Sequence, residues 1–450
     1  MRIRAGLLLV LGFCGLPSSV LAHPKLRKSV PAAGDTLRVS PAAVTLAFSE
    51  RVELAMSRIE ITDERNVVIA LSALSHGSDR SSLVAMPLHA LAPGAYRLSW
   101  RMVGPDGHPT TGNFPFTVLG PPAAVMPVVS GGELPLGPTL SADTEAGARL
   151  SLPSYLISRA LSFAALIALI GAIIFRYGVL TRSRVEPAIL AALERQTAGI
   201  GITAAASLIA VSLFRLYLQH RLMSAGGVMA ADDPLRMLSA TQWGQAWILQ
   251  VVAATVAAGG LSYGRGGKPG GWTAALATVP FLAGATGMGG HAGASAQPTV
   301  AMTADTLHVI GAGGWIGALL CVLIVAVAPA VRDRDERGWR TVAAVVNAFS
   351  PLALFFAAIV ALTGLISAWL RMQTLSDLFG TEYGLALVRK LVVVSVLVGT
   401  GAYNYLRVRP VLGTAQATAR LRRSTIVELV VGFVIVILTA VLVATDPPLK

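Results

Sequence analysis

The sequence has 450 residues, of which 54% are hydrophobic and only 13% charged, so it is too apolar for an ordinary soluble protein. Its formal net charge of +13 does not indicate nucleic-acid binding, because the basic residues lie mainly in short loops between apolar runs. The glycine-rich stretch 264–269 lacks the spacing and the following Ser or Thr of a nucleotide-binding loop. The composition indicates an integral membrane protein with a smaller polar part and with neither nucleic acid nor nucleotide as a partner.

Residues 1–22 are typical of a secretory signal peptide. Arg2 and Arg4 form a charged start, an apolar core covers 5–16, and Val20-Leu-Ala22 ends in residues suited to signal peptidase. Cleavage after Ala22 would make His23 the first residue of the mature chain. That chain would keep one cysteine of the two in the sequence, which excludes an internal disulfide and a cysteine-based zinc or iron–sulfur site.

Residues 23–119 alternate between polar and apolar positions in short runs separated by Pro- and Gly-rich turns. This pattern predicts an all-β Greek-key sandwich of the immunoglobulin type. The expected strands include 44–48, 57–62, 96–102 and 113–118. Residues 120–150 are rich in Pro, Gly, Ala and Ser without a clear period, and we interpret them as a periplasmic linker.

The remainder, 151–450, contains eight apolar runs close to the length of a bilayer span. They predict an all-α membrane bundle of about eight transmembrane helices. The runs are 155–176, 199–218, 245–263, 272–288, 307–330, 350–370, 386–406 and 425–444. The fourth is short and Gly-rich, so we expect it to pack inside the bundle rather than against lipid.

The loops set the orientation. Those after the first, third, fifth and seventh runs hold most of the bundle's Arg and Lys residues, whereas the loop 289–304 holds none. Because cytoplasmic loops are the positively charged ones, this bias predicts a multi-pass protein of the bacterial inner membrane. The sandwich and both ends of the mature chain would then lie in the periplasm.

Three residues of the polar part form a candidate Cu(II) site: His23, Asp106 and His108. An N-terminal His offers its α-amine and ring Nδ1 as a chelating pair, His108 adds a second imidazole, and Asp106 adds an oxygen. Pro24 has no amide N–H, so a copper motif built on that backbone amide cannot form. From the residues alone, Asp106-Gly-His-Pro109 is equally readable as a turn with an exposed histidine.

The membrane part has a second, less specific group of candidate ligands. His291 follows the fourth run, and Asp305 and His308 are three residues apart near the start of the fifth, with Met302 nearby. Polar groups in a membrane are costly and often functional, so these four residues are candidates for a copper path. The alternative is an interfacial pair that anchors the helix.

Other polar or soft side chains have a structural reading as well as a functional one. Arg389 and Lys390 are expected to extend to the membrane interface. Met223, Met229 and Met237 could line a soft route for copper or serve in packing. Glu428 could bond within the bundle or assist ion exit.

Residues 23–119 resemble the CopC family of periplasmic copper-binding proteins. The resemblance rests on His23-Pro24, Pro31-Ala-Ala-Gly34, Leu46-Ala-Phe-Ser49 and the long stretch 96–112, Tyr-Arg-Leu-Ser-Trp-Arg-Met-Val-Gly-Pro-Asp-Gly-His-Pro-Thr-Thr-Gly. It implies a Cu(II) site at His23, Asp106 and His108. Some members add a methionine-rich loop for Cu(I), but this segment has only Met56, Met86 and Met102, without a cluster.

Residues 150–445 resemble the CopD family of copper-resistance membrane proteins. The resemblance rests on Gly290-His-Ala292, on 305–319, on Phe349-Ser-Pro-Leu-Ala353 with Thr363-Gly364, and on 381–390. It implies passage of copper across the inner membrane, or its acquisition there, with copper as Cu(I) or Cu(II).

These observations together predict a copper homeostasis and resistance protein that is not an enzyme. It would bind periplasmic Cu(II) and pass copper to its membrane part for transport, with import as the favoured direction. Its partners would be the copper ion, the lipid bilayer and other periplasmic copper carriers. The alternatives are copper sequestration with the bundle as an anchor, a copper oxygenase at the N-terminal histidine, and a haem electron carrier.

Overall fold

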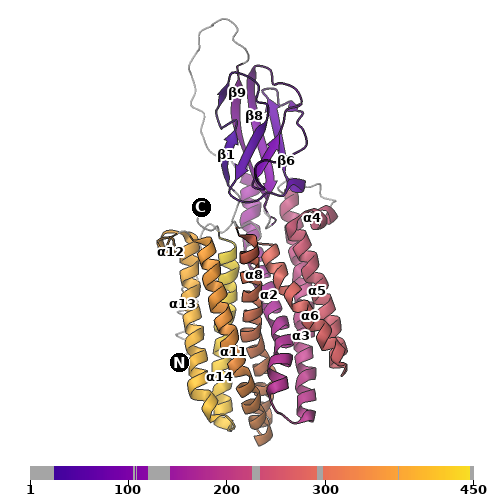
Figure 1. Ribbon diagram of the computed structural model, residues 1–450, viewed down its shortest axis with the longest axis vertical. Coiled ribbons are helices and arrows are strands. Elements are labelled where there is room, and N and C mark those ends of the chain that lie inside the picture. The colour runs from indigo at the N-terminus through magenta and orange to yellow at the C-terminus, as the bar shows by residue number, and fades with distance from the viewer. Residues whose placement is uncertain are drawn as a thin grey trace.

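The computed structural model describes residues 25–104, 107, 109–119, 142–225, 234–290, 297–372 and 374–445. A β-sandwich stands at one end of a bundle of long helices that run along the long axis of the molecule (Figure 1). Both parts match the predicted fold class.

The sandwich consists of two sheets. One has the strand order β1-β3-β7-β6 and the other the order β2-β9-β8-β4-β5. The strands are β1 (Leu26–Val30), β2 (Thr36–Leu37), β3 (Val44–Phe48), β4 (Arg58–Asp63), β5 (Val68–Ile69), β6 (Ser75–His76), β7 (Ser82–Ala85), β8 (Gly94–Val103) and β9 (Pro109–Val118). A short 3-10 turn, η1 (Leu54–Met56), precedes β4.

Alternation places every second side chain of these strands in the space between the sheets. Leu46, Leu98 and Phe116 are among the buried core residues, and Trp100 meets Phe48 edge to face with their ring centroids 5.1 Å apart. All four strand segments expected from the sequence are present, with ends that differ by a few residues.

Each of the eight apolar runs coincides, over all or nearly all of its length, with a helical element that is longer than the run. The first five of these elements along the chain are α2 (Ala142–Ile174), α3 (Pro187–Ala225), α5 (Gln242–Arg265), α6 (Pro269–Met288) and α8 (Pro298–Ala312), which continues through η4 (Gly313–Gly317), α9 (Ala318–Cys321), η5 (Val322–Val327) and α10 (Ala328–Asp333). The last three are α11 (Glu336–Arg371), α13 (Glu382–Tyr403) and α14 (Ala415–Val443). Two short helices, α4 (Pro234–Ala240) and α12 (Asp377–Gly380), lie at the end that carries the sandwich (Figure 1).

Seven helices of the described residues are long and apolar enough to cross a membrane, and α6 is not among them. Its 20 residues give a length of about 30 Å, but many of them are Gly, Ala or Thr. It packs against α5 and α8, but Leu276 and Phe281 on its outer face are exposed, so the bundle does not enclose it as expected for the fourth run. Helix α2 begins at Ala142, within the segment expected to be a linker.

Small residues let α2 approach the π-helical segment η4 directly. A Cβ atom on Gly171 would lie 2.2 Å from the carbonyl carbon of Gly317, and one on Gly317 would lie 2.0 Å from the Ile167 carbonyl oxygen. Real Cβ atoms do not come so close, so these two backbones touch without intervening side chains.

Candidate metal centre

Four of the predicted copper ligands, His23, Asp106, His108 and His291, lie outside the described residues. Within the described ranges no three His, Cys, Asp or Glu side chains come together as a metal site would require. The structure does describe the surroundings of these positions and the other candidates, Met302, Asp305 and His308.

Gly107, which lies between Asp106 and His108 in the sequence, packs against the membrane bundle. Its carbonyl oxygen accepts a hydrogen bond from the side-chain amide of Gln219 on α3. A Cβ atom at Gly107 would lie 2.7 Å from Gln219 Nε2 and 3.3 Å from Cγ of Trp243 on α5, and the residue has φ +82°. Only glycine fits both this contact and this backbone conformation.

A carboxylate from the sandwich extends the contact. Glu53 Oε1 accepts a hydrogen bond from the backbone N–H of Gln242, at 3.2 Å, in the first turn of α5. Such a helix end favours a negative charge. Burial nevertheless raises the pKa of the Glu53 carboxyl, although the Gln242 bond and the charges of His76 and Arg80 act in the opposite direction. The sandwich is therefore held by a carboxylate that gives up part of its hydration.

Three methionines meet at the same junction. Met56 of the sandwich, Met223 of α3 and Met237 of α4 are all buried in one cluster, together with Val103 and Trp243. The sequence allowed both a packing role and a copper role for Met223 and Met237 but did not connect either of them with Met56, and Met229 lies outside the described residues. The junction gathers thioether sulfur atoms, which are soft ligands.

The second group of candidates faces α11. Asp305 Oδ2 forms an ion pair of 3.1 Å with Arg371, and its Oδ1 accepts a hydrogen bond from Ser367 Oγ. His308 Nδ1 lies 3.0 Å from the Thr363 hydroxyl. Asp305 and His308 thus share one face of α8, as their spacing predicted, but each bonds to α11 rather than to the other.

The helix places His308 deeper than the apolar run suggested. Because α8 begins at Pro298, His308 lies ten residues, or about 15 Å, along the helix. Met302 lies one turn before Asp305, where its backbone packs against Gly287 of α6. These candidates line the contacts of α8 with α6 and α11.

Sequence reasoning missed the α11 side of this group. Thr363, Ser367 and Arg371 recur every four residues, which places them on one helix face. Lys390 of α13, which was expected to extend to the membrane interface, interacts electrostatically with Asp305 and Arg371. The spacing on α11 was visible in the sequence, but nothing there indicated which helix it faces.

Family models cover most of the chain. The CopC domain matches residues 26–119, the N-terminal domain of copper resistance protein D-like proteins matches 150–299, and copper resistance protein D matches 343–442. The chain is similar to the copper transport protein CutJ of Bacillus subtilis (strain 168), with 26% identity over 456 residues, which cover 99% of this chain and 78% of that protein.

The sandwich has its own relatives. Copper resistance protein C of Escherichia coli is 35% identical over 111 residues, which cover 23% of this chain and 87% of that protein. A crystal structure is known of PcoC, a methionine-rich copper resistance protein from Escherichia coli, which is 36% identical in sequence. The match covers 22% of this chain and 99% of that one, with a TM-score of 0.20. CopC from Methylosinus trichosporium OB3b is 30% identical and fully covered by 23% of this chain, with a TM-score of 0.21.

The family models and the CutJ match agree with both predicted resemblances. The relatives are copper resistance and copper transport proteins by name. Together with the apolar helices, the matches make the chain a multi-pass membrane protein. It belongs to the copper-resistance families CopC and CopD, as a fusion of a CopC domain with a CopD-type membrane part.

Proposed function

We propose that this protein captures Cu(II) outside the cytoplasm through His23, Asp106 and His108 and delivers copper to its membrane bundle for import. The observation that carries the proposal is the contact of Gly107 with Gln219 and Trp243. The two predicted ligands adjoin Gly107 in the sequence. Copper held by them would therefore be bound next to the contact between the sandwich and the bundle.

The charge of the loops supports the orientation. The segments that join α2 to α3, α5 to α6, α10 to α11 and α13 to α14 lie at the end opposite the sandwich, and these segments together with the helix ends beside them are rich in Arg and Lys. Because positively charged loops stay in the cytoplasm, the sandwich faces the periplasm. Its position outside favours import over export.

Two sets of side chains supply a route beyond the capture site. The cluster of Met56, Met223 and Met237 offers thioethers, which bind Cu(I), so reduction by an electron donor from outside the chain must precede their use. His308 offers an imidazole deeper in the bundle. Asp305 serves in positioning rather than as a ligand, since its carboxylate is engaged by Arg371 and Ser367.

Copper uptake into proteoliposomes that contain the full chain tests the proposal. We expect His108→Ala and His308→Ala each to lower the initial rate at least about tenfold, which is the loss of about 1.4 kcal/mol of binding or barrier energy. His89→Ala is the matched control, because His89 is an exposed histidine of the sandwich. Wild-type protein that binds copper but moves none would instead show that it sequesters copper.

The capture site has a separate test. One alanine inserted between Ala22 and His23 leaves the histidine ring in place but moves the free α-amine to another residue. We expect the Cu(II) affinity of the purified protein to fall at least about a hundredfold, as a chelate that loses one of its nitrogens would. An affinity unchanged by the insertion would rule out the N-terminal amine as a ligand.

A further inference from the structure

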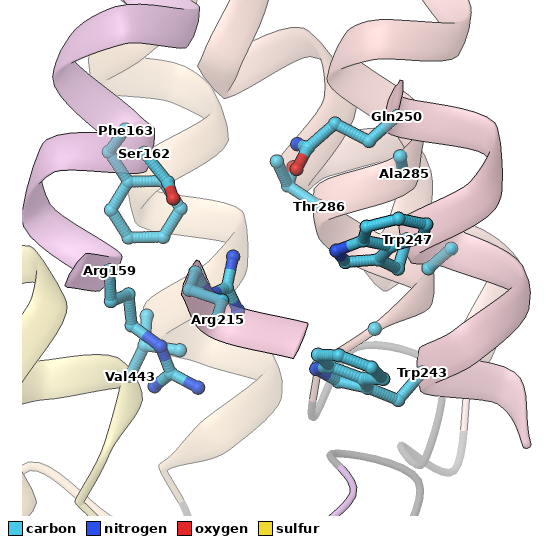
Figure 2. Close-up of a pocket in the computed structure, with 13 residues that line it drawn as sticks. Arg159, Ser162, Phe163, Arg215, Trp243, Trp247, Gln250, Ala285, Thr286 and Val443 are labelled. Carbon is cyan, nitrogen blue, oxygen red and sulfur yellow. The ribbon is translucent and has the colours of Figure 1, made fainter. Parts of the chain in front are cut away.

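A cavity in the membrane part contains two arginine side chains. It has a volume of about 60 Å³ and lies near the outer end of the bundle, where Trp243 separates it from Gly107. Arg159 of α2 and Arg215 of α3 reach it from neighbouring helices, and Trp243 and Trp247 of α5 form the opposite wall (Figure 2). The side chain of Arg159 is nine-tenths buried, with 6% of its surface exposed.

Neither arginine has an acidic partner among the described residues. Arg159 donates a hydrogen bond of 2.8 Å to the Tyr155 hydroxyl, and Arg215 bonds to the same side chain. Tyr155 is uncharged, and the other charged group acting on Arg215 is Arg159 itself. Two like charges thus lie side by side in a low-dielectric region, where an unpaired charge is costly.

Two other arginines of the bundle form ion pairs with carboxylates. Arg176 pairs with Glu194 at 2.9 Å and Arg371 pairs with Asp305 at 3.1 Å. The chain therefore supplies carboxylates to arginines elsewhere in the bundle, and the described part of the cavity lacks one.

The free polar groups around the cavity are mainly donors. Arg215 Nε and Ser162 Oγ are buried without a hydrogen-bond partner in the described structure, and both residues line the cavity. Guanidinium and hydroxyl groups can both donate hydrogen bonds to a negative ligand. A cavity of this size holds a few water molecules or one small ion.

We propose that this cavity binds one small monovalent anion of the size of a halide, held by Arg159, Arg215 and Ser162. The anion supplies the negative charge that the surrounding helices lack. This site is independent of the copper ligands, so its existence does not depend on the direction or chemistry of copper transport.

Thermal unfolding of the purified full-length protein tests the site. Sodium chloride is compared with sodium gluconate at equal ionic strength, because gluconate is too large for the cavity. We expect chloride to raise the unfolding midpoint of the wild type in a saturable manner. Arg215→Gln and Arg159→Gln should abolish this rise, and Arg337→Gln, which removes the same charge from an exposed position, should keep it.

The direction in which Arg215→Gln shifts the unfolding midpoint in gluconate is a second, independent readout. Without an anion, removing one of two unpaired buried charges relieves repulsion, so Arg215→Gln should unfold at the same temperature as the wild type or higher. Arg215→Lys, which keeps the charge, should retain part of the chloride response. The fluorescence of Trp243 and Trp247 should follow the same chloride dependence in the wild type.

Three outcomes would overturn the proposal. The first is a wild-type midpoint that is equal in chloride and gluconate. The second is a chloride response that survives both glutamine substitutions. The third is an Arg215→Gln variant destabilised equally in both salts, which would indicate a carboxylate of the chain as the permanent partner.

Discussion

Two sites of buried charge, one in each half of the membrane bundle, differ in how the charge is compensated. In the half formed by α8, α11 and α13, which we call the paired half, Asp305 forms an ion pair with Arg371, accepts a hydrogen bond from Ser367 and interacts electrostatically with Lys390. In the half formed by α2, α3 and α5, which we call the docked half because the sandwich rests on it, Arg159 and Arg215 have no described acid beside them. At Asp305 the chain supplies a carboxylate to its cations, whereas at Arg159 and Arg215 the proposed anion supplies the negative charge.

The largest expected effect comes from breaking the paired half. Asp305→Asn removes the negative charge and leaves Arg371 and Lys390 in one partly buried site without compensation. We expect the unfolding free energy to fall by about 3 kcal/mol, the cost of removing one partner of a buried pair. Chemical unfolding in detergent micelles measures the loss.

Glu336→Gln is the control for this substitution. Glu336 also pairs with an arginine, Arg340, at 2.8 Å, but both side chains are about three-quarters exposed. Its loss should cost about 0.5 kcal/mol or less. Equal effects of the two substitutions would mean that Asp305 gains nothing from its buried position.

An intermediate effect is expected at the contact of the docked half with the sandwich. Gly107→Ala introduces a Cβ atom against Gln219 and forces alanine into a left-handed conformation, which together should weaken docking by about 1–2 kcal/mol. Spin labels at Val67→Cys and Phe379→Cys report this change. The distribution of distances between them should become broader or its mean should increase. Cys321 is buried and should remain unlabelled.

Gly34→Ala is the control that separates the effect of the left-handed backbone conformation from the effect of the contact with Gln219. Gly34 also has a positive φ, +78°, but nothing lies within 4 Å of the position that a Cβ would occupy. This variant should lose stability in the sandwich and keep the wild-type distance between the labels. A label distance that Gly107→Ala leaves unchanged would show that the Gly107 contact does not hold the sandwich on the bundle.

The smallest expected effect concerns pH. Burial raises the pKa of Glu53 from its ordinary value of 4.5, so the docked state binds the proton more tightly than the undocked state. Docking should therefore strengthen as pH falls through the docked-state pKa, and the gain should be complete below 4.5. Glu53→Gln mimics the neutral form and should remove this dependence.

We expect the docked fraction of Glu53→Gln at neutral pH to match that of the wild type at acidic pH. The same pair of spin labels reports it. If the variant instead had a smaller docked fraction than the wild type at every pH, the charged carboxylate would be the form favoured at the first turn of α5, as helix-end electrostatics alone would predict.

The sequence was sufficient for those features that depend on local pattern. Alternation predicted the strands around Val44–Phe48 and Tyr96–Met102, because each strand of a sandwich has one face in the core. Apolar runs located all eight helical elements. They underestimated the lengths, since segments of mixed polarity such as 298–306 of α8 continue the helix beyond the apolar run.

Contacts between distant segments could not be predicted in this way. Gln219 reaches Gly107 across 112 positions, and Met56 meets Met223 only because the sandwich docks on α3. Spacing within one helix shows which residues share a face but not what that face meets. For the same reason Lys390 was expected at the membrane interface, whereas the fold brings it close to the charge of Asp305.

The contact between Gly171 and Gly317 has a mechanical consequence. Where two backbones touch, no side chain can yield between them, so we expect a tilt of α2 at this contact to displace the η4 segment as well. Arg159 lies twelve residues from this contact along α2, about 18 Å, and His308 lies nine residues from it along α8, about 14 Å, both toward the sandwich. A tilt of α2 that widens the arginine cavity should therefore move the half-buried His308 as well.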